Sequence, residues 1–374
     1  MTEHRSPRRP APRSARAGAT RSGRAGATWP TRRPRVGILA TGDRWHVEAL
    51  AAALRRAGCE PIAFDGRRLS GRVGLPPDKA GADPGRPGPA GIHADAIDLD
   101  RLDALLVRFI PAGSLDQIVF RMDALHLLAD DGLPVINHPR AIERTVDKHW
   151  TSRLLAAAGV ATPRTVVAEQ AADAQRAFRE MGDVVVKPLL GAGGRGICRV
   201  SDRDVAYRVF RALEDHRAVF YVQEFVPHGR SDLRLLVVGG RVVAAARRHG
   251  NGWKTNVAAG ARMTAHEPDR VETDLALRAC RAVGAEVAGV DLLEADDGRI
   301  LVCEVNGIPG WSALERATGR RIADEVAALV VDRLGARRAR VVAATAGQAR
   351  TEISRAQAPR SRAEGIRSRA QAAR

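Results

Sequence analysis

Residues 184–200, VVVKPLLGAGGRGICRV, carry a glycine-rich loop directly after an apolar run. The loop formally matches G-x-G-x-x-G, but a dinucleotide-binding loop opens a helix, and here the β-like run ICRV follows. A Walker A loop needs G-K-[ST] after its glycines, and this chain has G-R-G-I. We therefore predict a strand–loop–strand unit whose main-chain N–H groups approach phosphates. Its candidate phosphate-binding glycines are Gly191, Gly193, Gly194 and Gly196.

Lys187 is the last residue of the apolar run and is followed by Pro188. A flexible turn would explain the glycines, but it would not explain a lysine at the end of a buried strand, where lysines rarely lie unpaired. We predict that Lys187 reaches the same phosphates as a fixed positive charge.

A second group of polar residues lies near the C-terminus. The apolar runs AGVDLLEA and LVCEVNGIPG carry Asp291 and Glu304 on either side of the turn ADDGR. In a hairpin centred on that turn the two carboxylates pair across the ladder, and Asn306 points to the same face. Adjacent carboxylates repel each other unless a cation lies between them, and hard oxygen ligands suit Mg²⁺. We predict that Asp291, Glu304 and Asn306 bind Mg²⁺ or Mn²⁺.

The charge of the chain is concentrated in its two ends. Residues 1–34 and 335–374 each carry a net charge of +8, out of +17 for the whole chain. Both ends are poor in bulky apolar residues, so we expect disordered tails over residues 1–34 and 337–374. A dedicated nucleic-acid domain would keep a basic face on its folded part, so we expect at most weak, salt-sensitive tail contacts with nucleic acid.

Between the tails, strand-like and helix-like segments alternate, which predicts an α/β parallel sheet in the first domain, residues 35–140. We expect a helix over 141–159 to open a central subdomain at 141–220. Antiparallel hairpins with turns at Gly239-Gly240 and Asp297-Gly298 then predict an α+β subdomain at 221–336. Four scattered cysteines and the lack of a long apolar run favour a cytoplasmic protein with reduced thiols and no membrane span.

These segments resemble the ATP-grasp superfamily, and specifically the RimK-like carboxylate–amine ligases, from about Val36 to Leu334. The most specific stretches are VDKHWTSRLLAAAGVATPRT, VVVKPLLGAGGRG, QEFV…SDLRLLVVGGRVVAAARR and GVDLL…EVNGIPG. The resemblance implies a pre-ATP-grasp domain followed by two subdomains that clamp ATP. Ala192 departs from the family pattern, where many relatives carry Ser.

The resemblance also implies roles for single residues. Lys148 and Lys187 would hold phosphates, and Glu224 and Phe225 would contact adenine. Asp232 would bind on the ribose side with Arg234 on the same strand face, the alternative being an ordinary surface pair. Arg247, Asn256 and Lys254 would lie near the transferred phosphate, Arg247 and Lys187 acting in catalysis, although Asn256 could also belong to a turn.

The implied reaction is ATP-dependent amide formation through an acyl phosphate, with two metal ions on the acidic group and release of ADP and phosphate. L-Glutamate would be the amine donor. The carboxylate acceptor would be a cofactor or a protein C-terminus, and fragments such as VRFIPAGSLDQIVFRMDALHLL look most like tetrahydromethanopterin-type glutamate ligases. The family leaves the oligomeric state open, with a homodimer common.

Two other classes of protein remain as alternatives. The tails could serve as basic arms of a ribosome- or nucleic-acid-associated binding protein. An NAD-dependent oxidoreductase would require a helix after Gly196.

Overall fold

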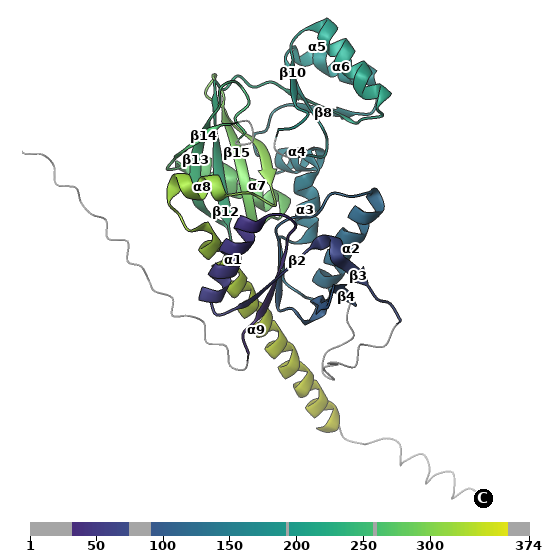
Figure 1. Ribbon diagram of the computed structural model, residues 1–374, viewed down its shortest axis with the longest axis vertical. Coiled ribbons are helices and arrows are strands. Elements are labelled where there is room, and N and C mark those ends of the chain that lie inside the picture. Colours follow the sequence, from purple (N-terminus) through teal and green to yellow (C-terminus); the bar gives the residue numbers. More distant parts are fainter. Residues whose placement is uncertain (1–31, 75–90, 192–193, 257–259, 358–374) are drawn as a thin grey trace, which may run out of the picture.

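The computed structural model of the chain describes residues 32–74, 91–191, 194–256 and 260–357, with side chains up to residue 340. The predicted disordered tails therefore fall largely outside the described residues, at 1–31 and 358–374. Three sheets with their helices form the body of the molecule, and a small fourth sheet is attached to the first of these sheets (Figure 1).

The first domain is built on a parallel sheet of order β2-β1-β6-β7, as the alternation of strands and helices predicted. Its strands are β1 (Arg35–Leu39), β2 (Glu60–Phe64), β6 (Ala104–Val107) and β7 (Val135–Ile136). Its helices are α1 (Arg44–Arg56) and α2 (Leu115–Asp130). A three-stranded antiparallel sheet, β3 (Leu69–Gly71), β4 (Ile92–Ala94) and β5 (Ile97–Asp98), is attached to it. Ser114 caps α2 through a capping box with Gln117, which explains where that helix begins.

The helix expected over 141–159 is two helices, α3 (Pro139–Val146) and α4 (Lys148–Ala157). Pro139 occupies the first turn of α3, where its missing N–H costs nothing. The break falls at Asp147, whose extended backbone ends α3 and whose carboxylate accepts a hydrogen bond from the Trp150 N–H to cap α4.

The central subdomain is a sheet of order β10-β9-β11-β8. Its elements are β8 (Thr165–Ala168), α5 (Ala171–Met181), β9 (Val184–Lys187), β10 (Cys198–Val200), α6 (Arg203–Asp215) and β11 (Phe220–Glu224). Strand β10 pairs antiparallel with β9, so the glycine loop joins two strands as predicted, and the oxidoreductase alternative fails. The domain boundary predicted at residue 221 falls inside β11, which belongs to this sheet.

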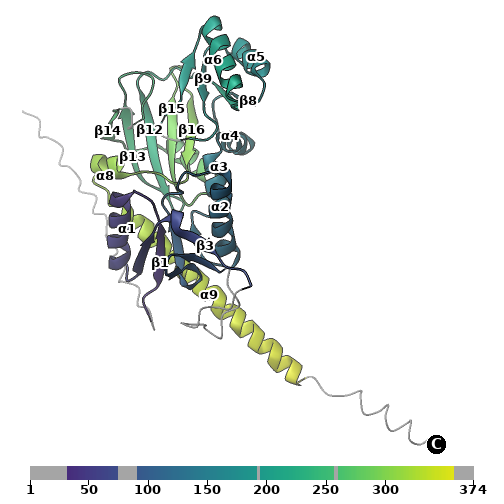
Figure 2. The same ribbon diagram turned by 45° about the vertical axis from the view of Figure 1, so that its right-hand side comes forward.

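The C-terminal subdomain is an antiparallel sheet of order β14-β13-β12-β15-β16 (Figure 2). Its elements are β12 (Ser231–Val238), β13 (Arg241–His249), β14 (Arg262–Ala265), α7 (Arg270–Val283), β15 (Val287–Glu294) and β16 (Ile300–Asn306). Both predicted hairpin turns are present. Leu233, Leu235 and Ala245 on one face of the sheet pack in a common core with Leu275 and Ala279 of α7.

The opposite face shares a core with the first domain and the last helices. Ile38 and Leu50 from the first domain pack in one cluster with Leu236, Trp311 and Val330. The last helices are α8 (Ser312–Thr318) and α9 (Ile322–Gln357). The first domain, the C-terminal sheet and the last two helices are therefore held together by one common core.

Helix α9 corrects one expectation. The predicted disordered tail began at residue 337, but α9 continues to Gln357 and projects beyond the body (Figures 1 and 2). Alanine and arginine are among the strongest helix formers, so this composition sustains a helix that already has a packed first half.

Asn137 joins the first domain to the C-terminal subdomain. Its side chain is 2% exposed and donates to the Val287 and Gly307 carbonyl oxygens. Its Oδ1 accepts from the Glu286 and Val287 N–H groups, at 2.8 and 2.9 Å. Thr145 also fits closely against Gly307, where a Cβ would lie 2.3 Å from the threonine oxygen. The segment that follows Asn306 is thus fixed from the first domain.

Candidate active site

The predicted site residues converge between the central sheet and the C-terminal sheet. Two adjoining cavities lie there, and five residues line both of them: Lys187, Ile197, Asn256, Cys303 and Glu304. Residues from β9, from the glycine loop and from β16 therefore face a common space, although β16 lies more than one hundred residues after the other two.

Lys187 ends β9 beside this space, as predicted. Its Nζ donates to Gln223 Oε1 at 2.6 Å and lies 3.8 Å from Cys303 Sγ. Burial lowers the pKa of Lys187, but its neighbours, Cys303 foremost, outweigh that effect and hold the pKa above its ordinary value. Lys187 is therefore a permanent cation at the junction of the two cavities.

Lys148, the first residue of α4, holds the glycine loop. Its Nζ donates to the carbonyl oxygens of Leu189 and Gly191, at 3.2 and 2.8 Å. Burial lowers the pKa of its ammonium. Lys148 is thus placed beside the loop predicted to cover the phosphates.

The glycines of the loop have conformations that other residues rarely adopt. Gly191, Gly194 and Gly196 have φ angles of 146°, 73° and 69°, whereas Gly193 lies outside the described residues. A Cβ on Gly194 would lie 2.5 Å from Asn256 Oδ1, so Asn256 contacts the loop and lines the site rather than a remote turn. Lys254 secures the same segment, since its Nζ donates to the Ile197 carbonyl at 2.6 Å.

Glu224 and Phe225 line the other end of the second cavity. The Glu224 carboxylate accepts from the main-chain N–H and the Nε of Arg164, at 3.0 and 2.6 Å. The Arg199 guanidinium lies 3.5 Å from the centroid of the Phe225 ring, and Trp253 meets that ring edge-on. Flat, partly apolar walls of this kind suit a heterocyclic base.

An ion-pair network covers the site face of the C-terminal sheet. Arg248 donates to both carboxylate oxygens of Asp232, and it also contacts Asp291 Oδ2 at 3.0 Å. Arg234 donates to Asp291 Oδ1 at 2.6 Å. Asp232 and Arg234 are 4% and 8% exposed, so they are not a surface pair. A Cβ at Gly289 would lie 2.5 Å from the Arg234 guanidinium, so only glycine leaves room for that group.

The predicted metal ligands meet at the edge of this network. Asp291 and Glu304 are paired residues on β15 and β16, and Asn306 ends β16 two residues later. Burial raises the pKa of Asp291, but Arg234 and Arg248 outweigh it and hold that pKa below its ordinary value. Asp291 is therefore an anion, and the donor set is two carboxylates and an amide oxygen, which fits Mg²⁺. Across the described ranges no cluster of three or more His, Cys, Asp or Glu residues suits a metal, and the predicted set contains only two such residues beside Asn306.

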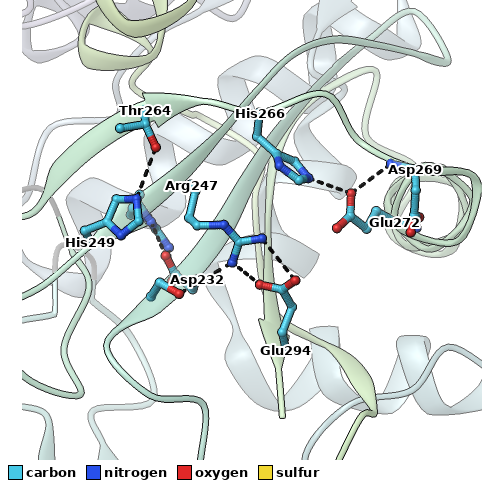
Figure 3. Close-up of polar contacts among 10 residues, drawn as sticks. Asp232, Arg247, His249, Thr264, His266, Asp269, Glu272 and Glu294 are labelled. Atoms are coloured by element: carbon cyan, nitrogen blue, oxygen red, sulfur yellow. Dashed lines mark hydrogen bonds and ion pairs between the residues drawn. The ribbon is translucent and has the colours of Figure 1, made fainter. Parts of the chain in front are cut away.

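Arg247 corrects a second expectation, because it does not face this site. Successive residues of a strand point to opposite faces, and Arg247 shares its face with Leu233, on the side of α7. Its guanidinium pairs with Glu294, near His266 and Glu272 (Figure 3). The neighbouring Arg248 is the arginine of β13 that lines the site cavity.

Sequence reasoning missed several other lining residues. Arg248, Gln223 and Cys303 contact predicted site residues, and His228, expected on the surface, is 8% exposed and lines the second cavity. Arg248 could have been found from the predicted hairpin. Asp232 and Arg234 point to one face of their strand, and Arg248 lies opposite Asp232 on the paired strand.

Two sheets that enclose a glycine loop, two lysines and a paired Asp–Glu edge define an ATP-grasp fold. The description "RimK-like ATP-grasp domain" fits residues 145–330. The tetrahydromethanopterin:alpha-L-glutamate ligase of Methanosarcina acetivorans is 30% identical over 318 residues, which are 76% of this chain and 95% of that protein. The protein of that name from Methanocaldococcus jannaschii is 37% identical over 61% of this chain and 79% of its own.

Among solved structures, the ATP-grasp ligase PsnB complexed with minimal precursor, Mg and ADP has a TM-score of 0.61. It is 22% identical and covers 80% of this chain and 98% of its own, so it supports the fold alone. The chain belongs to the RimK-like ATP-grasp ligases. The comparisons do not support the alternative of a ribosome- or nucleic-acid-associated binding protein. Within the described residues, no helix has both the length and the apolarity to cross a membrane.

Proposed function

We propose that this chain joins L-glutamate to the carboxylate of a second substrate, with ATP converted to ADP and phosphate. The observation that carries the proposal is the convergence of Lys148, Lys187 and the glycine loop with the Asp291–Glu304 pair around one space. The names of the relatives favour L-glutamate as the amine donor and a tetrahydromethanopterin-like cofactor as the acceptor. A protein C-terminus is the other acceptor that we propose to test.

The residues of the site have distinct tasks in this reaction. Glu224, Phe225 and Asp232 would bind the adenosine part, and Lys148, Lys187 and the loop glycines the phosphates. Asp291, Glu304 and Asn306 would hold two Mg²⁺ ions, which supply charge neutralisation on the phosphates when bound. The number of ions is part of the proposal.

The acceptor carboxylate attacks the γ-phosphate of ATP, and ADP leaves as the acyl phosphate forms. The amine of glutamate then attacks the acyl carbon and phosphate departs. Lys187 and the network around Arg234 and Arg248 supply fixed positive charge where negative charge develops, and they need no reorganisation during the reaction. The enclosing sheets align the reactants and exclude water.

The test follows nucleotide products with the purified full chain, Mg²⁺, ATP and L-glutamate, against acceptors that include a reduced pterin and a ribosomal protein tail. ADP and phosphate that form only with glutamate and one acceptor, together with a product heavier by one glutamyl residue, support the proposal. AMP and pyrophosphate would instead indicate adenylation and overturn the acyl-phosphate route. A cytoplasmic location and a homodimer remain proposals that fractionation and light scattering would test.

A further inference from the structure

The parallel sheet of the first domain has a topological switch point that the site described above does not use. Its order, β2-β1-β6-β7, sends the chain outward from β1 in both directions, so the switch lies between β1 and β6. In open α/β sheets, ligands bind outside the carboxyl ends of the strands at such a point. Asp43 follows β1 there, and Arg108 directly follows β6.

Arg108 is buried, and one of its side-chain donors has no partner among the described residues. Its side chain is 6% exposed, and its guanidinium lies 4.3 Å from the centroid of the Trp311 ring. Its Nη2 donates a hydrogen bond of 3.3 Å to Asp43 Oδ2 and forms an ion pair with that carboxylate. The buried Nε finds no hydrogen-bond partner among the residues that the structure describes. An arginine offers five donors in a planar fork, and burying that fork without partners is costly.

Trp311 adds a second unused donor in the same place. It is 1% exposed, and its indole N–H is likewise without a partner in the described part of the chain. Buried indole N–H groups usually find a partner. Two neighbouring side chains, one from each domain, thus present unpaired donors at one point.

The cluster is tied to the segment that leads away from the metal ligands. The main-chain N–H of Trp311, five residues after Asn306, donates to His46 Nε2 at 3.0 Å. His46 Nδ1 therefore carries the proton and donates to Asp43 Oδ1 at 2.5 Å. Asp43 thus accepts from His46 through Oδ1 and from Arg108 through Oδ2, which leaves the Nε of Arg108 without a partner among the described residues.

The other buried arginine of this domain provides a contrast. Arg121 is 7% exposed, but its Nη1 donates to the carbonyl oxygens of Pro111 and Ala112, at 2.7 and 3.4 Å. Arg121 thus braces the main chain, whereas Arg108 donates to no main-chain oxygen of the described ranges. The exposed Trp45 ring meets the His46 ring edge-on, with 4.8 Å between the ring centroids.

We propose that Arg108 and the indole N–H of Trp311 bind a carboxylate of the amine-donating substrate. This inference rests on the proposed function and names the substrate group that this part of the protein recognises. A carboxylate that becomes phosphorylated must lie at Asp291 and Glu304, so a carboxylate bound at Arg108 is one that does not react. L-Glutamate has two such carboxylates, and its amine could then extend toward the segment after Asn306.

The test measures binding of L-glutamate by isothermal titration calorimetry, with the full chain saturated with Mg²⁺ and a non-hydrolysable ATP analogue. The Arg108→Met variant keeps the packing on Trp311 but removes the donors, and Arg121→Met is the matched control. We expect Arg108→Met to weaken L-glutamate binding about tenfold or more, since a charge-assisted hydrogen bond is lost. Affinity for the ATP analogue should stay within about twofold of the wild-type value, because no charge in the nucleotide site changes. Arg121→Met should change neither affinity.

If Arg108→Met does not fold, Arg108→Lys serves the same purpose, because it keeps the charge and loses the planar fork. Unchanged L-glutamate affinity in the Arg108 variant, or equal weakening in the Arg121 variant, would overturn the inference. Failure of the wild-type chain to bind L-glutamate while it binds the ATP analogue would overturn it as well. Failure to bind the ATP analogue would instead count against the proposed function.

Discussion

Asp291 on β15 and Glu304 on β16 lie directly opposite each other, and a bulge follows immediately at Leu292. The bulge brings Cys303 to line the cavities together with Glu304, so two consecutive residues of β16 reach the site. The Asp291 carboxylate is already held by Arg234 and Arg248, whereas Glu304 faces Lys148 and Lys187 across the cavity. Asp291 is thus fixed in orientation before any cation or nucleotide binds.

This pairing predicts that Glu304→Gln keeps the fold and loses turnover. The amide has nearly the shape of the carboxylate but no charge, so cation binding weakens, and we expect kcat to fall about 100-fold or more. Glu294→Gln, at the end of β15 on the other face, is the matched control and should keep its turnover. Turnover by Glu304→Gln comparable to that of the wild type would rule out the metal assignment.

The two neighbouring arginines of β13 should differ in their effect on activity. Lysine keeps the charge but loses the bidentate fork that Arg248 uses on Asp232, so Arg248→Lys should lower kcat/KM about tenfold. Arg247→Lys should stay within about twofold, because Arg247 faces α7 and pairs with Glu294. Steady-state kinetics on the two variants provide the measurement. A larger loss of kcat/KM in Arg247→Lys than in Arg248→Lys would support the original prediction that Arg247 lies near the transferred phosphate.

The Arg247–Glu294 pair also predicts a pH dependence of stability. The hydrogen bond from Arg247 holds the pKa of Glu294 below its ordinary value. A lowered pKa in the folded state contributes stability above the pKa of the unfolded chain, and that contribution disappears as the pH falls through the folded value. Glu294→Gln should therefore reduce the free energy of unfolding at pH 7 by less than about 1 kcal/mol, since the pair is partly exposed.

Urea unfolding at several pH values tests this expectation. The difference between the wild type and Glu294→Gln should shrink between about pH 5 and pH 3. A difference that does not vary with pH would mean that the charge of Glu294 contributes nothing.

Alanine substitutions at two glycines with similar φ angles distinguish the effect of backbone strain from the effect of a side-chain clash. Gly194 and Gly240 have φ angles of 73° and 76°, so alanine should cost about 1 kcal/mol or more of strain at either position. Only at Gly194 would the new Cβ meet Asn256, at 2.5 Å, whereas it meets nothing within 4 Å at Gly240. We expect Gly194→Ala to raise the KM for ATP about tenfold and Gly240→Ala to leave it unchanged. An equal KM in the two variants would show that the loop does not contact the nucleotide.

Asn137 should contribute strongly to stability, because its buried side chain makes four hydrogen bonds to the main chain of the C-terminal subdomain. Asn137→Asp replaces an amide that donates to the Val287 and Gly307 carbonyls by an oxygen that cannot donate, and it buries a charge. We expect the free energy of unfolding to fall by about 2 kcal/mol or more. The exposed Asn251→Asp is the control for the same chemical change, and urea unfolding measures both. Equal effects of the two changes would contradict the role of Asn137.

Several features followed from the sequence alone because they depend on local chemistry. The apolar run before the glycine loop and the β-like run after it predicted strand–loop–strand, and β9 and β10 confirm it. The turn at Asp297-Gly298 predicted a hairpin, and Asp291 lies opposite Glu304 as expected. The ladder next to the turn pairs Leu292 with Val302, however, so it is the bulge between Asp291 and Leu292 that brings Glu304 rather than Cys303 opposite Asp291. Hairpin geometry acts over a few residues, so local spacing was sufficient to predict the hairpin itself, but it did not predict the bulge.

Other features were decided only by the tertiary structure. The sequence RRH shows two adjacent arginines, and which of them faces the site depends on the side of the sheet on which α7 packs. The break at Asp147 depends on a cap that competes with helix continuation. His46 and Trp311, 265 residues apart, meet because the segment after β16 packs against the first domain, where Asn137 also donates to the Gly307 carbonyl. No local pattern encodes such a contact, since it exists only once separate cores have packed together.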